Sequence, residues 1–329
     1  MKYFLGVDAG GTKTHALIAD ETGQAVGFSE SGPGSWEVVG YDGLTRNLLK
    51  VTSQAMEIAK INVSQISGCG MGLAGYDWPS QQKAHREAIQ PLQLSGPVSI
   101  VNDTLLGITA GSAEGWGVSV VSGTGCNCRG WSRGHQREGR VVGGGSPWSG
   151  EAAGGFDILA RAVRAVIFEW VKRGPATALT PALLHHTGAV NLDDLVEGIY
   201  LGRYELDPSL ILMVFDIARQ GDHQALEVVR WAGDELGQMA MSVISQLDLQ
   251  EEIFDVVMIG SIFDGHPLMT ESLGSTIHSV APGARLIRLT VPPVVGGVLL
   301  GMQQAGWDAS LARPVLIETT RKLHAAVKS

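Results

Sequence analysis

One local pattern, a strand followed by a glycine turn and a second strand, occurs in both halves of the 329-residue chain. The strands predicted for the first half are residues 3–8, 15–20 and 25–29. Those predicted for the second half are residues 118–121, 127–132 and 139–142. Short strands separated by tight turns are typical of antiparallel meanders. The repetition predicts two related structural units and restricts the fold more than any other feature.

Each meander is followed by alternating strands and helices, and a long helical run at residues 156–247 interrupts the second half. This pattern predicts an α/β fold made of a duplicated unit, with a cleft between the copies. We place the N-terminal lobe at residues 1–114. The C-terminal lobe, at residues 115–329, includes the helical insertion.

Glycine is unusually frequent, at 44 of 329 residues, and charged residues make up only 17%. A disordered chain needs the opposite balance, and no Gly-X-Y period suggests collagen. The glycines are therefore expected to serve particular backbone positions.

The net charge of −9 and the three cysteines exclude several classes of protein. An acidic protein without a run of basic residues repels the phosphate backbone of nucleic acids and is not expected to bind them. No apolar stretch is long enough to cross a bilayer, and no signal peptide opens the chain. Three cysteines make no disulfide framework or zinc spacing. We expect a cytoplasmic protein with reduced thiols and no membrane or nucleic-acid partner.

The first glycine turn is a candidate phosphate site. Gly10 and Gly11 expose backbone N–H groups, Thr12 adds a hydroxyl, and Lys13 adds a positive charge. Asp8, at the end of the preceding strand, could hold a metal-bound water. The turn leads into a strand and lacks the spacing of a P-loop or a dinucleotide fingerprint. An ordinary hairpin is the alternative.

The second glycine turn, with Gly123, Thr124 and Gly125, occupies the matching position in the second half. Alone it is a weak signal. Two such hairpins facing one another across a cleft could hold a polyphosphate from both sides.

Asp103 follows a strand and precedes a helix, which places it at the ligand-binding edge of an α/β sheet. There its carboxylate could accept the proton of a hydroxyl that attacks phosphorus. The alternative is a helix N-cap, for which Asp is also well suited.

Other glycine clusters are less specific. Residues 143–151 are predicted to form a loop that closes on a ligand. Gly260 and Ser261 follow an apolar strand, and such a small-residue turn would let a flat adenine ring approach the backbone. The glycines at 296, 297 and 301 lie on one helix, where close packing is the favoured interpretation.

Taken in order, these motifs resemble the N-acetylglucosamine kinase branch of the sugar kinase/Hsp70/actin superfamily, which is grouped with the BadF/BadG-type ATPases. The resemblance rests on the two glycine turns, the Gly-Leu-Ala-Gly segment at residues 72–75, Asn102-Asp103, Asn127-Cys128-Arg129 and Gly260-Ser261. It implies a two-lobed actin-like ATPase fold, built from duplicated ribonuclease H-like domains, that closes on ATP, Mg²⁺ and a sugar.

The resemblance also implies roles for individual residues. Asp103 would be the general base that serves phosphoryl transfer to an amino sugar such as N-acetylglucosamine or glucosamine, most often at the 6-hydroxyl. Asp8 would act on Mg²⁺. Contacts to ATP would come from Gly10, Gly11, Thr12, Lys13, Gly123, Thr124, Gly125, Gly260 and Ser261. Contacts to the sugar would come from Ser35, Trp36, Asn127, Gly144, Gly145, Ser146 and Glu151. We also expect a homodimer.

This chain departs from the family pattern only on the sugar side. Ser35 stands where an Asn is usual, Ser146 ends a segment that usually holds a Trp, and Glu151 replaces an Asp. Two alternatives therefore stay open: a nucleotide- and sugar-binding sensor with weak catalysis, and an ATPase activator of a reductase. Such activators hold an iron–sulfur cluster through cysteines, and Cys69, Cys126 and Cys128 offer no plausible set.

Overall fold

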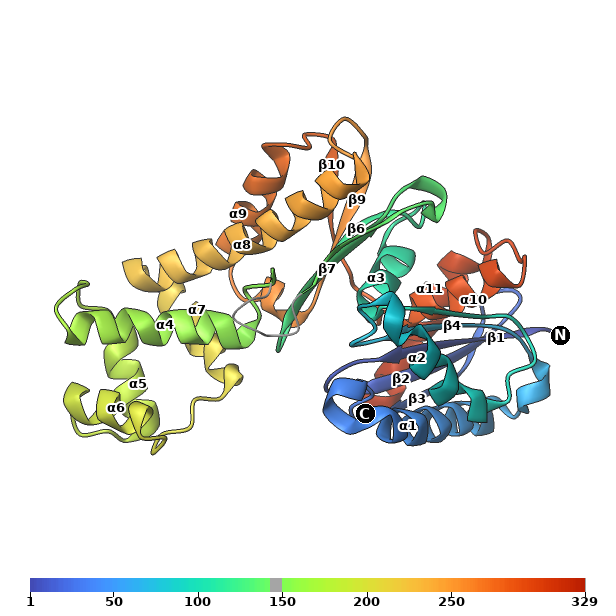
Figure 1. The fold of residues 1–329 in the computed structure, drawn as a ribbon, viewed down its shortest axis with the longest axis horizontal. Coiled ribbons are helices and arrows are strands. Elements are labelled where there is room, and N and C mark those ends of the chain that lie inside the picture. The colour runs from blue at the N-terminus through green and yellow to red at the C-terminus, as the bar shows by residue number, and fades with distance from the viewer. Residues whose placement is uncertain (143–149, 329) are drawn as a thin grey trace.

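The protein consists of two lobes, each built on a five-stranded mixed sheet, in a computed structural model that describes residues 1–142 and 150–328 (Figure 1). The first sheet contains β1 (Tyr3–Ala9), β2 (Thr14–Asp20), β3 (Ala25–Ser31), β4 (Ile66–Leu73) and β5 (Val98–Val101). The second contains β6 (Gly117–Ser122), β7 (Cys126–Trp131), β8 (Glu138–Val141), β9 (Phe254–Ile259) and β10 (Ala284–Arg288).

The two sheets have the same topology. The strand orders are β3-β2-β1-β4-β5 in the first sheet and β8-β7-β6-β9-β10 in the second. Each strand of the first sheet therefore corresponds to the strand numbered five higher in the second. In both, the first three strands pair antiparallel, the fourth pairs in parallel with the first, and the fifth pairs in parallel with the fourth. The predicted duplication and both predicted meanders are therefore confirmed.

Alternating side chains of the first sheet enter two separate cores. Leu5 and Val7 of β1 face α1 (Trp36–Ala59), whereas Phe4 faces the C-terminal helices α10 (Val294–Gln304) and α11 (Ala312–Lys328). Since both faces of the sheet are covered, all seven residues of β2 are buried. The helix α1 begins at Trp36 and has a break at Gly40, whose φ of 68° is left-handed.

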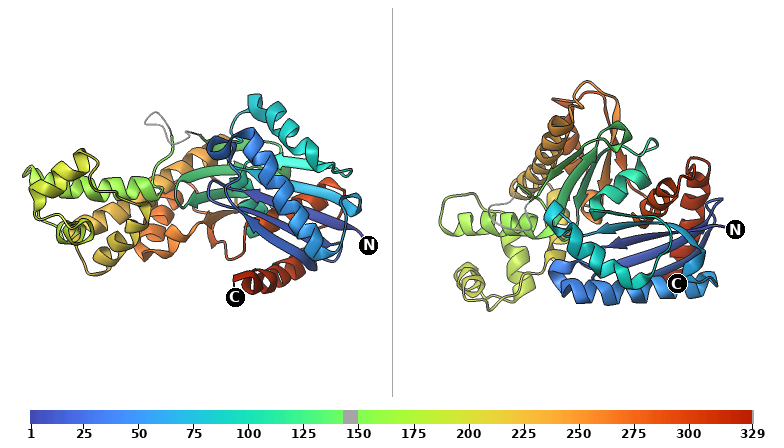
Figure 2. Two further views of the ribbon diagram at one scale, coloured as in Figure 1. Left: turned by 90° about the horizontal axis from the view of Figure 1, so that it is seen from below. Right: turned by 45° about the vertical axis from the view of Figure 1, so that its right-hand side comes forward.

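The second lobe carries the predicted helical insertion, most of which extends away from the sheet (Figure 2), while its last helix packs on β6, β7 and β8. Its helices are α4 (Gly155–Trp170), α5 (Leu179–Thr187), α6 (Leu192–Tyr200), α7 (Ile211–Arg219) and α8 (His223–Leu247). The sequence pattern missed α5 and also α9 (Pro267–His278), which packs along α8. In the first lobe, α2 (Gln82–Ile89) ends before the turn that contains Pro91.

Two helices join the lobes. The first, α3 (Asp103–Gly111), leaves the first sheet and packs on β6, β7 and β9, whereas α10 leaves the second sheet and packs on β1 and β4. The two helices also pack on each other.

Glycine permits this contact, because a Cβ at Gly296 would lie 2.1 Å from the Leu106 carbonyl oxygen and one at Gly297 would lie 2.8 Å from that of Gly70. The packing interpretation of these glycines is confirmed. The division at residues 114 and 115 stays a prediction, to which the structure adds that α10 and α11 pack on the first sheet.

No helix among the described residues is both long and apolar enough to cross a membrane.

Candidate active site

A cleft of about 690 Å³ lies between the lobes and is lined by residues from both. It brings together the two glycine turns, Asp103 and several residues of the predicted sugar side. From the first lobe come Gly11, Thr12, Ser35, Glu37, Val38, Ala74, Gly75, Asp77, Asp103 and Thr104. From the second come Val121, Gly123, Thr124, Gly125, Cys126, Asn127, Glu151, Phe156 and Asp157.

The turn between β1 and β2 presents Gly11 and Thr12 to the cleft. Gly10 lies behind them. Its N–H donates to the Lys13 carbonyl over 2.9 Å, and its own carbonyl accepts from the N–H of Gly34 and of Ser35. Lys13 is exposed and does not line the cleft. The shape of this turn is therefore fixed by backbone hydrogen bonds around Gly10.

The turn between β6 and β7 presents Gly123, Thr124 and Gly125. The Gly123 N–H donates to the Gly125 carbonyl over 2.8 Å, and the first residue of α4, Gly155, donates its N–H to the Gly123 carbonyl over 2.8 Å. The N-terminus of α4 thus braces this hairpin.

Both hairpins have open space beside their glycines. A Cβ added at Gly11, Gly123 or Gly125 would meet no protein atom within 4 Å, so it would extend into open space. Backbone N–H groups in such glycine turns bind anions. These residues fit the phosphates of ATP, and their contact with ATP stays a prediction.

Asp103 is the first residue of α3, but it is not the N-cap. That position belongs to Asn102, whose side chain accepts the Thr104 N–H over 3.0 Å. Burial raises the pKa of Asp103 to about 6, against the opposing effects of the Thr104 N–H and the Arg129 guanidinium. A carboxyl with this pKa is mostly ionised at neutral pH. Its pKa is also near enough to pH 7 for the carboxylate to act as a proton acceptor.

Asp8 lies near Asp103, at the end of β1. Burial and the Asp103 carboxylate raise its pKa to about 7, while Lys13 acts in the opposite direction. Two neighbouring buried carboxylates are complementary to a divalent cation. Within residues 1–142 and 150–328, no three His, Cys, Asp or Glu side chains gather closely enough to hold a metal ion. Mg²⁺ keeps several waters and binds one or two carboxylates together with substrate phosphates, so Asp8 fits that ion.

On the predicted sugar side, Ser35, Asn127 and Glu151 line the cleft. The Oδ1 atom of Asn127 is buried and has no hydrogen-bond partner in the described structure, which leaves an acceptor for a ligand hydroxyl. Trp36 does not line the cleft. It stacks on Tyr41, with ring centroids 5.1 Å apart, and its Nε1 donates to the Gly75 carbonyl over 2.7 Å. Gly144, Gly145 and Ser146 lie outside the described residues.

Gly260 and Ser261 follow β9 but do not line the cleft. Gly260 has a φ of 107°, and an added Cβ would lie 2.0 Å from the Ser122 carbonyl oxygen. Packing against the end of β6 is therefore enough to require glycine here. A contact with the nucleoside stays a prediction.

Sequence reasoning missed three carboxylates that line the cleft: Glu37, Asp77 and Asp157. Each had a signal in the sequence. Glu37 follows Trp36, Asp77 is two residues beyond Gly75, and Asp157 occupies the third position of α4, where it accepts the Gly154 N–H over 3.0 Å. The three cysteines are free thiols, as expected, and burial raises their pKa.

Comparison with known proteins identifies the family. Residues 5–301 match the BadF/BadG/BcrA/BcrD ATPase family. The chain is 27% identical to the N-acetyl-D-glucosamine kinase of Dictyostelium discoideum, over 91% of this chain and 97% of that protein. It is 24% identical to the N-acetylmuramic acid/N-acetylglucosamine kinase of Clostridium acetobutylicum, over 92% of this chain and 99% of that protein.

A solved structure confirms the predicted two-lobed actin-like ATPase fold. The crystal structure of a protein described as an N-acetylglucosamine kinase from Chromobacterium violaceum superposes with a TM-score of 0.62 at 20% identity, covering 96% of this chain and 99% of that one. With the family match spanning nearly the whole chain, we conclude that the protein belongs to the BadF/BadG/BcrA/BcrD ATPase family.

Proposed function

We propose that the protein is an ATP-dependent kinase of an amino sugar, such as N-acetylglucosamine or glucosamine, acting on the 6-hydroxyl. One observation carries the proposal: a half-buried carboxylate, Asp103, shares a single cleft with two open glycine hairpins. The relatives named above are kinases of this class and match 92% and 91% of the chain. We propose a cytoplasmic homodimer as the working form.

In this mechanism the hairpins at Gly11 and at residues 123–125 orient the ATP phosphates through backbone N–H groups. The Asp103 carboxylate accepts the proton of the sugar hydroxyl while the hydroxyl oxygen forms a bond to the γ-phosphorus of ATP. The bond between that phosphorus and the ADP oxygen breaks. Mg²⁺, when bound, neutralises phosphate charge, and Asp8 is the residue to hold it through water. Such catalysis depends on positioning and on charge stabilisation.

The charge of the cleft restricts the sugar. Besides Asp103, four carboxyl residues line it, Glu37, Asp77, Glu151 and Asp157, and no described lining residue is Lys, Arg or His. Residues 143–149 contain no charged side chain either. A cleft with this lining repels a carboxylate on the sugar. We therefore expect activity on N-acetylglucosamine or glucosamine to exceed that on N-acetylmuramic acid, which carries a lactyl carboxylate.

The test is ADP release in a coupled assay with ATP, Mg²⁺ and a panel containing these three sugars, glucose and 6-deoxyglucosamine. The proposal expects sugar-dependent ADP release for at least one amino sugar and none for the 6-deoxy compound. Turnover of 6-deoxyglucosamine would exclude the 6-hydroxyl as the acceptor.

The same assay separates the alternative of a sensor. Because the departures from the family pattern lie on the sugar side, a protein that binds sugar without efficient transfer is the second candidate. Tight sugar binding by calorimetry with no ADP release over the panel would favour the sensor. An iron-coloured purified protein would instead favour an activator of a reductase.

A further inference from the structure

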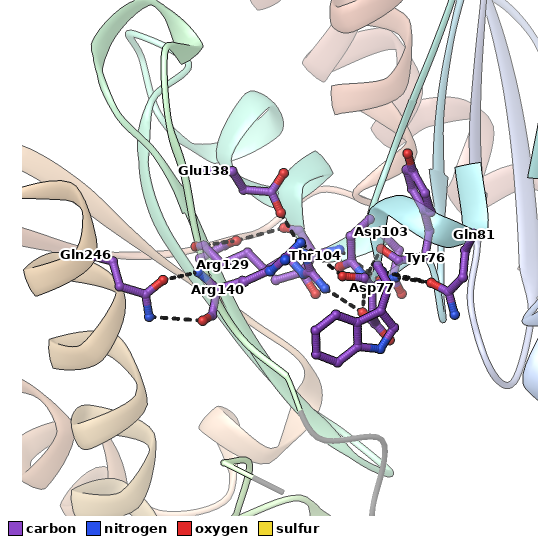
Figure 3. Close-up of polar contacts among 12 residues, drawn as sticks. Tyr76, Asp77, Gln81, Asp103, Thr104, Arg129, Glu138, Arg140 and Gln246 are labelled. Atoms are coloured by element: carbon purple, nitrogen blue, oxygen red, sulfur yellow. Dashed lines mark hydrogen bonds and ion pairs between the residues drawn. The ribbon is translucent and has the colours of Figure 1, made fainter. Parts of the chain in front are cut away.

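Arg129 of β7 is a fully buried cation that contacts both lobes. Its side chain is only 1% exposed, and its guanidinium lies 2.5 Å from the Asp77 carboxylate and 2.6 Å from that of Glu138. Glu138 is on the neighbouring strand β8 in the same lobe, whereas Asp77 follows β4 in the other lobe. A buried charge is tolerated only when it is paired, so one of its two required partners comes from across the cleft (Figure 3).

Arg140 makes a second contact from the same side. Its Nη1 donates to the Asp77 carbonyl over 3.1 Å, and its guanidinium lies 5.4 Å from the ring centroid of Trp78. The Arg140 backbone is paired in turn with the Gln246 side chain of α8 through bonds of 2.9 and 3.0 Å. Two cations anchored in the second lobe therefore hold the Asp77–Trp78 segment of the first lobe.

Hydrogen bonds continue from this segment to the candidate base. Asp77 Oδ1, which accepts from Arg129, also accepts from Asn102 Nδ2 over 3.1 Å. Asn102 Oδ1 accepts the Thr104 N–H over 3.0 Å, and the same N–H donates to Asp103 Oδ1 over 2.9 Å. The path from Arg129 to Asp103 thus passes through side chains that are largely removed from water.

We propose that Asp77 and Arg129 are positioning residues, which hold the Asn102–Asp103 strand end in its productive place through a contact that forms only when the two lobes are docked. This role rests on the proposed kinase function. The charges of the pair support it, because Arg129 lowers the pKa of Asp103 and Asp77 raises it.

Two substitutions in one network separate positioning from simple charge neutralisation. Asp77→Asn removes the negative charge that pairs with Arg129 from the opposite lobe, and Glu138→Gln removes the one from the same lobe. Both leave the guanidinium with one carboxylate. A purely structural need for a paired cation predicts similar losses for both.

The positioning role instead expects kcat to fall about tenfold to a hundredfold in Asp77→Asn, with the KM for ATP within about twofold of the wild type. It expects Glu138→Gln to stay within about threefold in both constants. Equal losses in both variants would overturn the proposal. So would a raised KM for the sugar at unchanged kcat in Asp77→Asn, because Asp77 would then be a substrate ligand.

Circular dichroism and thermal melting establish that each variant folds. If Asp77→Asn does not fold, Asp77→Glu keeps the charge and moves the carboxylate by one methylene, and the same fall in kcat is expected. Small-angle X-ray scattering is an independent measurement, in which Asp77→Asn should have a larger radius of gyration than both the wild type and Glu138→Gln.

These measurements keep the two proposals distinguishable. A wild-type protein that turns over no sugar in the panel speaks against the kinase function alone. In that case the scattering comparison decides, and a radius of gyration in Asp77→Asn equal to that of the wild type overturns the cross-lobe role.

Discussion

The two glycine hairpins occupy equivalent places in the duplicated fold, yet their surroundings differ in charge. Next to the β1–β2 turn lie two buried carboxyl groups, Asp8 and Asp103. At the matching end of β6 the residue is Ser122, whose hydroxyl donates to the Ala153 carbonyl over 2.8 Å. The first lobe thus holds the candidate reactive carboxylates beside its hairpin, while the β6–β7 turn itself presents only neutral groups and backbone to the cleft. The two units therefore share a topology but differ in the side chains that stand next to their glycine hairpins.

The largest expected effect is that of Asp103→Asn, which removes the candidate base from the charged lobe. We expect kcat to fall by roughly a thousandfold, within the range that general base catalysis contributes. ATP binding should persist, because the hairpins are untouched. Coupled ADP release and calorimetry measure the two quantities. Full turnover in this variant would remove Asp103 from the mechanism.

Asp8→Asn tests whether the neighbouring carboxylates Asp8 and Asp103 destabilise the folded protein while they serve turnover. We expect a loss of turnover of roughly a hundredfold, because a metal that neutralises phosphate charge contributes several kcal/mol. At pH 8 without nucleotide, the variant should melt at a higher temperature than the wild type, since one of two neighbouring buried carboxylates is gone. A lower melting temperature would contradict this account of the pair.

The two hairpins can be compared directly with Gly11→Ala and Gly123→Ala. Each methyl group would enter open space, so melting temperatures should stay unchanged while the KM for ATP rises by about tenfold, or ~1.4 kcal/mol. Gly32→Ala is the matched control, because its added Cβ also meets no atom within 4 Å and it does not line the cleft. An unchanged KM in only one hairpin variant would show that phosphate contact is one-sided.

The smallest expected effect concerns pH. The pKa of Asp103 is raised to about 6, so the ionised form that accepts a proton predominates above pH 6 and is lost below it. We expect kcat to be level near pH 8 and to fall about tenfold by pH 5.

Stability has the opposite dependence. The raised pKa of Asp8 and of Asp103 means that the free energy of unfolding of the nucleotide-free protein decreases as pH rises from about 4 to 7. Rate profiles and melting curves over this range test both signs.

Much of the site could be predicted from the sequence because its parts are local. A glycine turn between two strands, or Asp103 between a strand and a helix, is defined by a few consecutive residues, and the structure places Gly11, Gly123 and Asp103 in one cleft. Trp36 shows the limit of local reasoning. Its indole stacks on Tyr41 and donates to the Gly75 carbonyl, and it does not line the cleft.

The sequence by itself determined the duplication, the succession of strands along the chain and the positions of the glycine turns, because periodicity and turn chemistry operate over a few neighbouring residues. Only the tertiary structure decided which distant side chains meet. Arg129 and Asp77 are 52 residues apart, and nothing local in either segment identifies the other. Their pairing depends on how two sheets dock through α3 and α10, where close glycine packing sets the separation of the lobes.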